Sequence, residues 1–405
     1  MKPYLTIFLF ILSAACFAQH KITGTVYDAD DKKPLPNATV FLNNTTNGTQ
    51  TNNEGTYSVN NVKPGQYELI VSMVGYEPYR YSVKVYNDIK IPAIYLKSKT
   101  TSLSGVKIKA REISKKDIRA FKDELIGRSR FAKQCEIINP KIIDINYNAA
   151  DKLLTASTSD FLIVENKALG YRIKYLVNEF TRDEKKLYVA YEGYIQFEPM
   201  TGDAIQQQRW RRNRMEAYEG SSQHFLRSVL ANDTEQQGFK IFELSPNYKR
   251  PSDTVINAML KKYSDRAQFG SAAFRPNDSL AYWRDIQNLP KLLYYWSCEL
   301  HDRNFIYTTD QRSLYAMSYP ATMFITYKNK KSNKTPNSSF NLVAVNQPNS
   351  LGQWDTIVYL NELYAFFDIN GVFVNPAAIK MEGYWGKQRL ADLLPIDFEP
   401  GTDAL

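Results

Sequence analysis

The sequence predicts a mainly β protein, in which a small N-terminal β-sandwich is followed by a β-rich α+β region. Residues 21–97 break into short runs of alternating apolar and polar residues, separated by turn residues at regular intervals. Aromatic residues make up 13% of the 405 residues, with 28 Tyr against 18 Gly and 18 Pro, and aromatic side chains suit a half-buried pleated surface. Strand-like runs return after residue 139, between segments with helical periodicity.

Residues 1–18 have the pattern of a signal peptide. A short positive start precedes an apolar run, Tyr4–Ala15, which is too short to span a bilayer, and small residues occupy the two positions that a signal peptidase reads before Gln19. An alternative is a lipobox at Ser13–Cys16, with Cys16 lipidated as a membrane anchor. The leucine of a lipobox stands one position too early here, which favours cleavage. We therefore expect an exported protein of the periplasm, the outer membrane or the cell surface.

The charge of the chain restricts its partners. Lys and Arg number 51 against 42 Asp and Glu, which gives a net charge of +9. Such a charge would suit nucleic acid in a cytosolic protein, but export removes that opportunity, so we expect no nucleic-acid partner. Anionic glycans and lipid phosphates are the acidic partners available, and an envelope protein is the other partner class. After the signal peptide, no stretch is long and apolar enough for a transmembrane helix.

The alternating runs of residues 21–97 predict about seven strands. Gly55 and Gly65 stand in turns that need a positive φ, and the prolines lie where strands start, so no ladder donor is lost. The predicted strands cover Ile22–Tyr27, Ala38–Leu42, Thr49–Thr51, Tyr57–Val59, Tyr67–Met73, Val83–Val85 and Ile91–Leu96.

Three segments, ITGTVYDADDKKPLPNATVFL, TNNEGTYSV and VKPGQYELIVSMVGYEP, resemble the carboxypeptidase-like regulatory domain. The resemblance implies a seven-stranded transthyretin-like β-sandwich over residues 19–98, of a kind found in many bacterial envelope proteins. It implies no catalysis, because in relatives this domain is a folding or interaction unit attached to peptidases, receptors and surface proteins.

A second resemblance covers most of the remaining chain. The segments FLIVENKALGYRIKYLVNEF, RWRRNRMEAYEGSSQHFLRSVL and GYWGKQRLADLLP are similar to a group of secreted bacterial proteins. In that group the regulatory domain precedes an uncharacterised β-rich region, which corresponds here to residues 128–405. This resemblance implies the order of the parts and an exported location, but no activity.

Residues 99–127 should form a polar, basic linker and a helix. Ser114 can cap a helix that starts at Lys115 and ends near Ile126, with Gly127 as its stop. Three apolar side chains of this segment share one helical face, which should pack on a core.

The region that follows should combine a sheet with helices. An antiparallel sheet is predicted between Asn139 and Pro199, and helical sequence runs from Ala204 to Leu230. Gly220 interrupts this helical sequence, and Ser221 can cap a second helix. Near the end of the chain, Asn370-Gly371 predicts a type I′ hairpin turn.

The histidines argue against a zinc carboxypeptidase, which needs a His-x-x-Glu pair and a distant third His to hold the metal. The sequence has three His, namely His20, His224 and His301. Neither internal His has the required Glu, because Arg227 and Asn304 stand at those positions. We therefore expect no metal site and no cofactor.

A serine hydrolase is the other catalytic class that the histidines allow. His224 lies close to Ser221 and His301 adjoins Asp302, but no Gly-x-Ser-x-Gly motif accompanies them, and Ser221 is better explained as a helix cap. The prediction is a noncatalytic binding or assembly module for envelope glycans or protein partners. The alternative is an unrecognised hydrolase with its site in the C-terminal region and one of these two histidines as its base.

The densest group of cations is Arg209, Arg211, Arg212 and Arg214, around Trp210, on a predicted helix. Arginine binds phosphate and carboxylate groups through two parallel hydrogen bonds, so these five residues are the candidate binding site for an anionic glycan or a lipid headgroup. In the competing interpretation Trp210 is buried against the sheet and some of the arginines pair with nearby carboxylates.

All tryptophans lie beyond the sandwich, and exposed aromatic platforms would suit sugar rings. Trp is normally well buried, however, so we expect most of them to belong to cores. The five are Trp210, Trp283, Trp296, Trp354 and Trp385.

Two cysteines, Cys135 and Cys298, remain after removal of the signal peptide. In an oxidising compartment they could form a disulfide bridge, and geometry decides whether they do. Two separately buried thiols are an equal alternative, and the sequence leaves both open.

Overall fold

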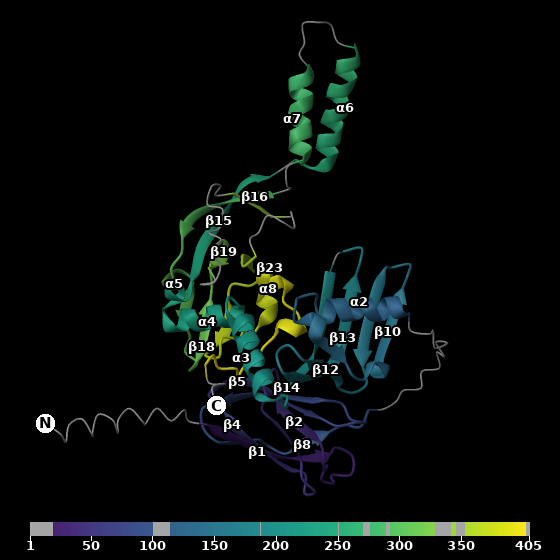
Figure 1. The fold of residues 1–405 in the computed structure, drawn as a ribbon, viewed down its shortest axis with the longest axis vertical. Coiled ribbons are helices and arrows are strands. Elements are labelled where there is room, and N and C mark those ends of the chain that lie inside the picture. The colour runs from purple at the N-terminus through teal and green to yellow at the C-terminus, as the bar shows by residue number, and fades with distance from the viewer. Residues whose placement is uncertain are drawn as a thin grey trace, which may run out of the picture. The chain divides into compact units, whose positions relative to one another are not determined.

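The structure, a computed structural model, describes residues 19–99, 114–186, 188–249, 251–269, 276–288, 292–328, 342–345 and 353–401 (Figure 1). The predicted signal peptide and most of the predicted linker fall outside the described residues. The chain is mainly β, as predicted, and divides into two compact units. Unit 1 comprises Met1–Glu219, Asp368–Val374 and Gln388–Leu405, and unit 2 comprises Gly220–Phe367 and Asn375–Lys387.

The N-terminal part of unit 1 is the predicted β-sandwich, with eight strands rather than seven. One sheet has the order β4-β1-β7, with β8 also on β1, and the other has the order β3-β2-β5-β6. The additional strand is β7, which lies before the predicted strand Ile91–Leu96. Pro92, which has no N–H to donate, separates β7 from β8, and both run parallel to β1. The strands are β1 (His20–Asp28), β2 (Thr39–Leu42), β3 (Gly48–Gln50), β4 (Thr56–Val62), β5 (Gly65–Ser72), β6 (Tyr79–Val85), β7 (Ile89–Lys90) and β8 (Ile94–Leu96).

Alternation along the strands places one side of each sheet in the sandwich core. β5, for example, buries Tyr67, Leu69 and Val71. The two turn glycines have positive φ as predicted, +69° at Gly55 and +155° at Gly65.

The next part of unit 1 is the antiparallel sheet predicted between residues 139 and 199. Its order is β10-β11-β13-β12-β9, and β14 pairs with β13 on the other side. The strands are β9 (Cys135–Ile137), β10 (Ile143–Asn148), β11 (Leu153–Thr158), β12 (Leu162–Asn166), β13 (Tyr171–Asp183) and β14 (Tyr188–Pro199).

Helix α2 (Lys115–Leu125) covers one face of this sheet (Figure 1). The Ser114 side chain accepts a hydrogen bond from a backbone N–H of the first turn, and Gly127 follows the helix with φ +96°, so both predicted ends are confirmed. The fully buried Phe121 packs edge-on against Phe180 of β13, with ring centroids 4.9 Å apart. This contact joins the helix to the core of the sheet.

Two helices follow the sheet at the predicted positions. α3 (Ala204–Tyr218) lies in unit 1, and α4 (Ser222–Ala231) begins unit 2. Between them Gly220 has φ +77°, and the Ser221 hydroxyl accepts a hydrogen bond from the backbone N–H of His224 at 3.1 Å. The predicted interruption and the predicted cap are confirmed.

Unit 2 contains a six-stranded sheet with the order β20-β16-β15-β19-β21-β23 and a three-stranded sheet with the order β17-β18-β22. Two helices, α6 (Asp253–Phe269) and α7 (Pro276–Asn288), are inserted between the neighbouring strands β15 and β16. The other elements are α5 (Thr234–Gln237), β15 (Phe239–Lys249), β16 (Leu292–Glu299), β17 (Ile306–Thr308), β18 (Leu314–Met317), β19 (Thr322–Tyr327), β20 (Leu342–Val345), β21 (Thr356–Leu360), β22 (Ala365–Asp368), β23 (Ile379–Gly383) and α8 (Tyr384–Lys387).

Short 3₁₀ helices occur at Ala132–Gln134, Pro140–Ile142, Asp302–Asn304, Pro376–Ala378 and Leu390–Asp392. None of the helices described is long and apolar enough to cross a membrane.

The type I′ turn predicted at Asn370-Gly371 is wrong. Such a turn needs positive φ at both central residues, whereas only Gly371, with φ +77°, is left-handed. The Asp368 carboxylate explains the difference, because its Oδ1 accepts the backbone N–H groups of Asn370 at 3.0 Å and Val372 at 3.2 Å. These bonds hold the chain in a different turn.

Candidate binding surface on helix α3

Helix α3 carries the five candidate residues, and its start is well defined. The Asp203 carboxylate accepts the backbone N–H of Gln206 at 2.8 Å, and the Gln206 side chain accepts the backbone N–H of Asp203 at 3.0 Å. This reciprocal pair is a capping box. Most of the helix is Gln, Arg, Met, Glu and Ala, which are strong helix formers.

One side of α3 is fixed to the turn between β12 and β13. The Trp210 indole N–H, the Asn213 amide and the Arg214 Nε donate to successive carbonyls of Lys167–Leu169, at 2.9, 2.7 and 2.7 Å. The Arg214 guanidinium also lies 4.2 Å from the centroid of the Tyr171 ring. These three α3 side chains are buried, so they serve to hold the helix in place.

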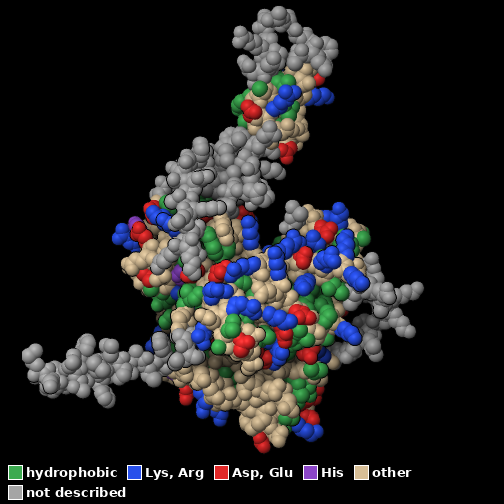
Figure 2. All heavy atoms as spheres, viewed as in Figure 1, with side chains coloured by type: hydrophobic (Ala, Val, Ile, Leu, Met, Phe, Trp, Pro, Cys, Tyr) green, Lys and Arg blue, Asp and Glu red, His purple; other side chains and the backbone are tan. Residues whose placement is uncertain are grey.

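The other side of α3 faces solvent. Arg209 and Arg212 are exposed and Arg211 is partly exposed. None of the ion pairs among the described residues involves these three side chains, and the nearest acidic residue of the helix, Glu216, pairs with Arg130 instead. We call Arg209, Arg211 and Arg212 the α3 basic face. Figure 2 shows Lys and Arg side chains gathered in this region.

The predicted cluster is therefore divided between two roles. The burial of Trp210 agrees with the competing interpretation. Arg214 donates to backbone carbonyls, and no ion pair among the described residues involves the other three arginines. Residues 210 and 214 are one helical turn apart and share the fixed side, whereas Arg209 and Arg212 share the other.

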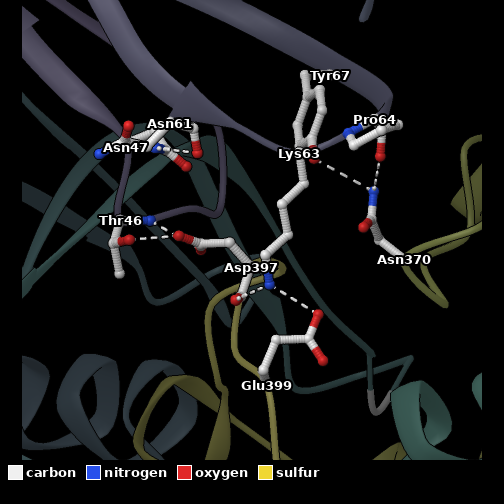
Figure 3. Close-up of polar contacts among 9 residues, drawn as sticks. All are labelled: Thr46, Asn47, Asn61, Lys63, Pro64, Tyr67, Asn370, Asp397 and Glu399. Carbon is white, nitrogen blue, oxygen red and sulfur yellow. Dashed lines mark hydrogen bonds and ion pairs between the residues drawn. The ribbon is translucent and has the colours of Figure 1, made fainter. Parts of the chain in front are cut away.

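A second group of polar contacts joins the sandwich to the C-terminal segment within unit 1 (Figure 3). The Thr46 hydroxyl donates to the Asp397 carboxylate, which also accepts the Thr46 backbone N–H at 2.9 Å. The Lys63 ammonium donates to the Asp397 carbonyl at 3.1 Å and to the Glu399 carboxylate at 2.7 Å. We call these four residues the latch.

The turn between β2 and β3 supports the latch with backbone bonds. The Asn44 N–H donates to the Ile195 carbonyl and the Asn44 carbonyl accepts the Ile396 N–H, both at 2.7 Å. The Thr45 carbonyl accepts the Phe197 N–H at 2.9 Å. The turn thus lies between β14 and the C-terminal segment.

Asn370 makes a further polar contact with the sandwich (Figure 3). Its amide donates to the Asp368 carboxylate at 2.9 Å, the Tyr67 hydroxyl at 3.3 Å and the Pro64 carbonyl at 3.4 Å. Burial raises the pKa of the Asp368 carboxyl above its ordinary value. The latch and the contacts of Asn370 were not predicted from the sequence. The polar run Asn43–Asn47, at the end of a strand, was the one local signal of the latch.

The histidines have structural roles in the described residues. Nδ1 of His224 accepts the Gly220 N–H at 3.0 Å, so the ring proton lies on Nε2, which donates to Gln237 Oε1 at 3.3 Å. The Ser221 hydroxyl caps α4. His301 is exposed and begins a 3₁₀ turn that ends at Asn304. Within the described residues, no group of three or more His, Cys, Asp or Glu could hold a metal ion.

Cys135 is buried, and burial raises the pKa of its thiol to about 12. Its Sγ lies 3.5 Å from the Phe131 carbonyl. Cys298 belongs to β16, and its side chain falls outside those described. A disulfide between the two stays a prediction.

Comparison with known proteins identifies the N-terminal domain. Residues 22–108 match the CarboxypepD_reg-like domain, which confirms the resemblance of the sandwich. A TonB-dependent receptor of Formosa agariphila is 38% identical over 89 residues, which are 22% of this chain. The chain spans 8% of the length of that receptor.

Two solved structures match part of this chain. A type II cohesin–X-dockerin complex from Acetivibrio cellulolyticus is 19% identical, with 19% of this chain and 56% of that chain covered and a TM-score of 0.17. The pilus 2b backbone protein of group B streptococcus is 16% identical, with 20% of this chain and 42% of that chain covered and a TM-score of 0.17.

Proposed function

We propose that this chain, which carries a CarboxypepD_reg-like domain at residues 22–108, is a noncatalytic binding module of the bacterial cell envelope, and that its α3 basic face binds an anionic envelope glycan. One observation carries the proposal. Arg209, Arg211 and Arg212 project from the free side of a helix whose other side is fixed by three buried side chains, and no carboxylate of the described residues pairs with them.

The chemistry of the face suits a polymer with repeated negative charges. Each guanidinium can bind a carboxylate or sulfate group through two hydrogen bonds. Arg209 and Arg212 are three positions apart on α3, so their side chains are neighbours and can bind successive charged groups. Because the helix is already rigid, little backbone entropy would be lost on binding.

The location rests on two features. The predicted signal peptide directs the chain out of the cytoplasm, and the similarity to a TonB-dependent receptor supports a place in the cell envelope. The hydrolase alternative has less support, because both ring nitrogens of His224 are engaged in hydrogen bonds, one with the Gly220 N–H at the start of α4 and one with the Gln237 side chain.

The test measures binding of the mature chain to immobilised alginate and heparin, with neutral dextran as the reference. Binding to both polyanions should fall as NaCl is raised, because the contacts are exposed charges. The double variant Arg209→Gln/Arg212→Gln should bind roughly tenfold more weakly. Arg80→Gln/Arg303→Gln removes the same charge from exposed positions elsewhere and should retain binding.

Three outcomes would overturn the proposal. They are binding that does not change with salt, an equal loss of binding in the two double variants, and binding of the chain to dextran as strong as to the polyanions. Crosslinking in intact envelopes that captures one protein through α3, without glycan retention, would favour a protein partner instead.

A further inference from the structure

Unit 2 contains a cavity of about 370 Å³ that no part of the proposal above uses. It lies beside three neighbouring strands, β15, β19 and β21. Leu244 of β15 lies opposite Thr322 of β19 in the sheet, and both line the cavity. The rest of the lining is Tyr319, Pro320, Ala321, Tyr359 and Leu360.

The two tyrosines of the cavity are held by carboxylates. The Tyr319 hydroxyl donates to Glu243 Oε2, and the Tyr359 hydroxyl donates to Glu382 Oε2 at 3.3 Å. Lys380 completes the second pair, because its Nζ lies 2.8 Å from Glu382 Oε1 and 5.2 Å from the centroid of the Tyr359 ring. Both rings are therefore fixed before any ligand arrives, which lowers the entropic cost of binding.

We infer that this cavity binds a neutral pyranose ring of a glycan. A pyranose has an apolar C–H face and a rim of hydroxyl groups. The C–H face can pack against Tyr319, Tyr359 and the aliphatic side chains of the lining. The sugar hydroxyls can bind the tyrosine hydroxyls and their carboxylate partners. The volume lies near the lower end of the range for ligand pockets, roughly 300–1,000 Å³, which suits one or two sugar rings.

None of the tryptophan side chains that the structure describes lines this cavity. Trp210 and Trp385 are buried, and Trp283 and Trp354 are partly buried. Trp354 packs edge-on against Tyr384, with ring centroids 4.6 Å apart. The inference therefore concerns tyrosines rather than tryptophans, and it stands whether or not the α3 basic face binds a polyanion.

The experiment is saturation-transfer NMR on the full mature chain with cellobiose, chitobiose and methyl galactoside at about 10 mM, a concentration suited to weak binding. Sorbitol, which has the hydroxyls but no ring, is the reference. At least one pyranose should receive saturation at its ring C–H protons, and sorbitol should not. The signal should be the same at low and high salt because the sugars carry no charge.

Variants locate the site. Tyr359→Ala should weaken binding by at least about fivefold, because one stacking ring is lost. Tyr307→Ala, at an exposed tyrosine of β17 outside the cavity lining, should bind as the unchanged chain does. Ala321→Phe fills the cavity while keeping both tyrosines, so it should abolish the signal even where Tyr359→Ala fails to fold.

Several results would overturn the inference. They are the absence of saturation transfer to all three sugars with the unchanged chain, equal transfer to sorbitol, and an undiminished signal in a folded Ala321→Phe chain. Arg209→Gln/Arg212→Gln should leave the sugar signal intact, so failure of this inference and failure of the proposed function are separable.

Discussion

Gly170 lies directly against Trp210, so that a Cβ on Gly170 would stand 2.3 Å from Cδ2 of the indole. The same glycine has φ +72° and contributes one of the carbonyls that Arg214 binds. The position of α3, and with it the direction of the α3 basic face, therefore depends on the absence of a side chain at residue 170.

Gly170→Ala should lower the free energy of unfolding by about 3 kcal/mol, from backbone strain and overpacking together. Gly75→Ala is the matched control, since its φ is +86° but a Cβ there would meet nothing within 4 Å, so it should cost only about 1 kcal/mol of strain. Urea unfolding followed by tryptophan fluorescence measures both. Equal losses in the two variants would show that the contact with Trp210 is unimportant.

The helix ends were predictable from sequence because their signals are local. Ser114 and Ser221 each bond a backbone N–H within three residues, so their roles could be inferred from short segments. The type I′ prediction at Asn370 was wrong for a related reason. A side chain two positions earlier, Asp368, competes for the backbone N–H groups of the turn, and its burial depends on the fold.

The division of the arginine cluster could not be predicted from sequence. Arg211 and Arg214 look alike in the sequence, and only the turn Lys167–Gly170, more than forty residues earlier, supplies the carbonyls that distinguish them. The latch is harder still, because Thr46 and Asp397 are 351 positions apart. No periodicity or local motif reports such a contact.

Asp397→Ala should lower the free energy of unfolding by roughly 2 kcal/mol, because the Thr46 N–H and hydroxyl would lose their acceptor. Hydrogen exchange at residues 43–47 should become faster. Glu399→Gln, which only weakens a partly exposed ion pair with Lys63, should cost less than about 1 kcal/mol. Unchanged exchange in the Asp397 variant would mean that the backbone bonds alone hold the turn.

Asp368 should make stability depend on pH. Burial raises its pKa in the folded chain, so the folded state binds this proton more tightly than the unfolded state. The stability associated with the protonated carboxyl is fully present below the unfolded pKa and is lost as pH rises through the folded pKa.

Asp368→Asn removes this titration. The unfolding free energy of the unchanged chain minus that of the variant should therefore fall as pH rises from acid toward neutral. Urea titrations of both proteins at several pH values measure it, and subtraction cancels the other acids. A difference that grows with pH would contradict the raised pKa.

Cys135 should resist alkylation in the folded chain. Its pKa of about 12 leaves almost no thiolate at neutral pH, and its side chain is buried. In the mature Cys298→Ser chain, iodoacetamide should label Cys135 only after denaturation, as mass spectrometry can follow. Mass analysis of the unsubstituted chain without reductant tests the predicted disulfide directly.

The two roles within the arginine cluster make opposite predictions for stability. Arg214→Gln should lower the free energy of unfolding by roughly 2–3 kcal/mol, because buried carbonyls of Leu169 and Gly170 would lose their donors. Arg209→Gln/Arg212→Gln removes twice the charge but should leave stability within about 0.5 kcal/mol, because both side chains are exposed and make no ion pair among the described residues.

Thermal and urea unfolding of these two variants measure the difference. If the double variant were the less stable one, the exposed arginines would be holding the fold, and a weakened glycan interaction could not be assigned to the surface itself. If instead Arg214→Gln unfolds early while the double variant keeps the melting temperature of the unchanged chain, any loss of polyanion binding by the double variant belongs to the α3 basic face.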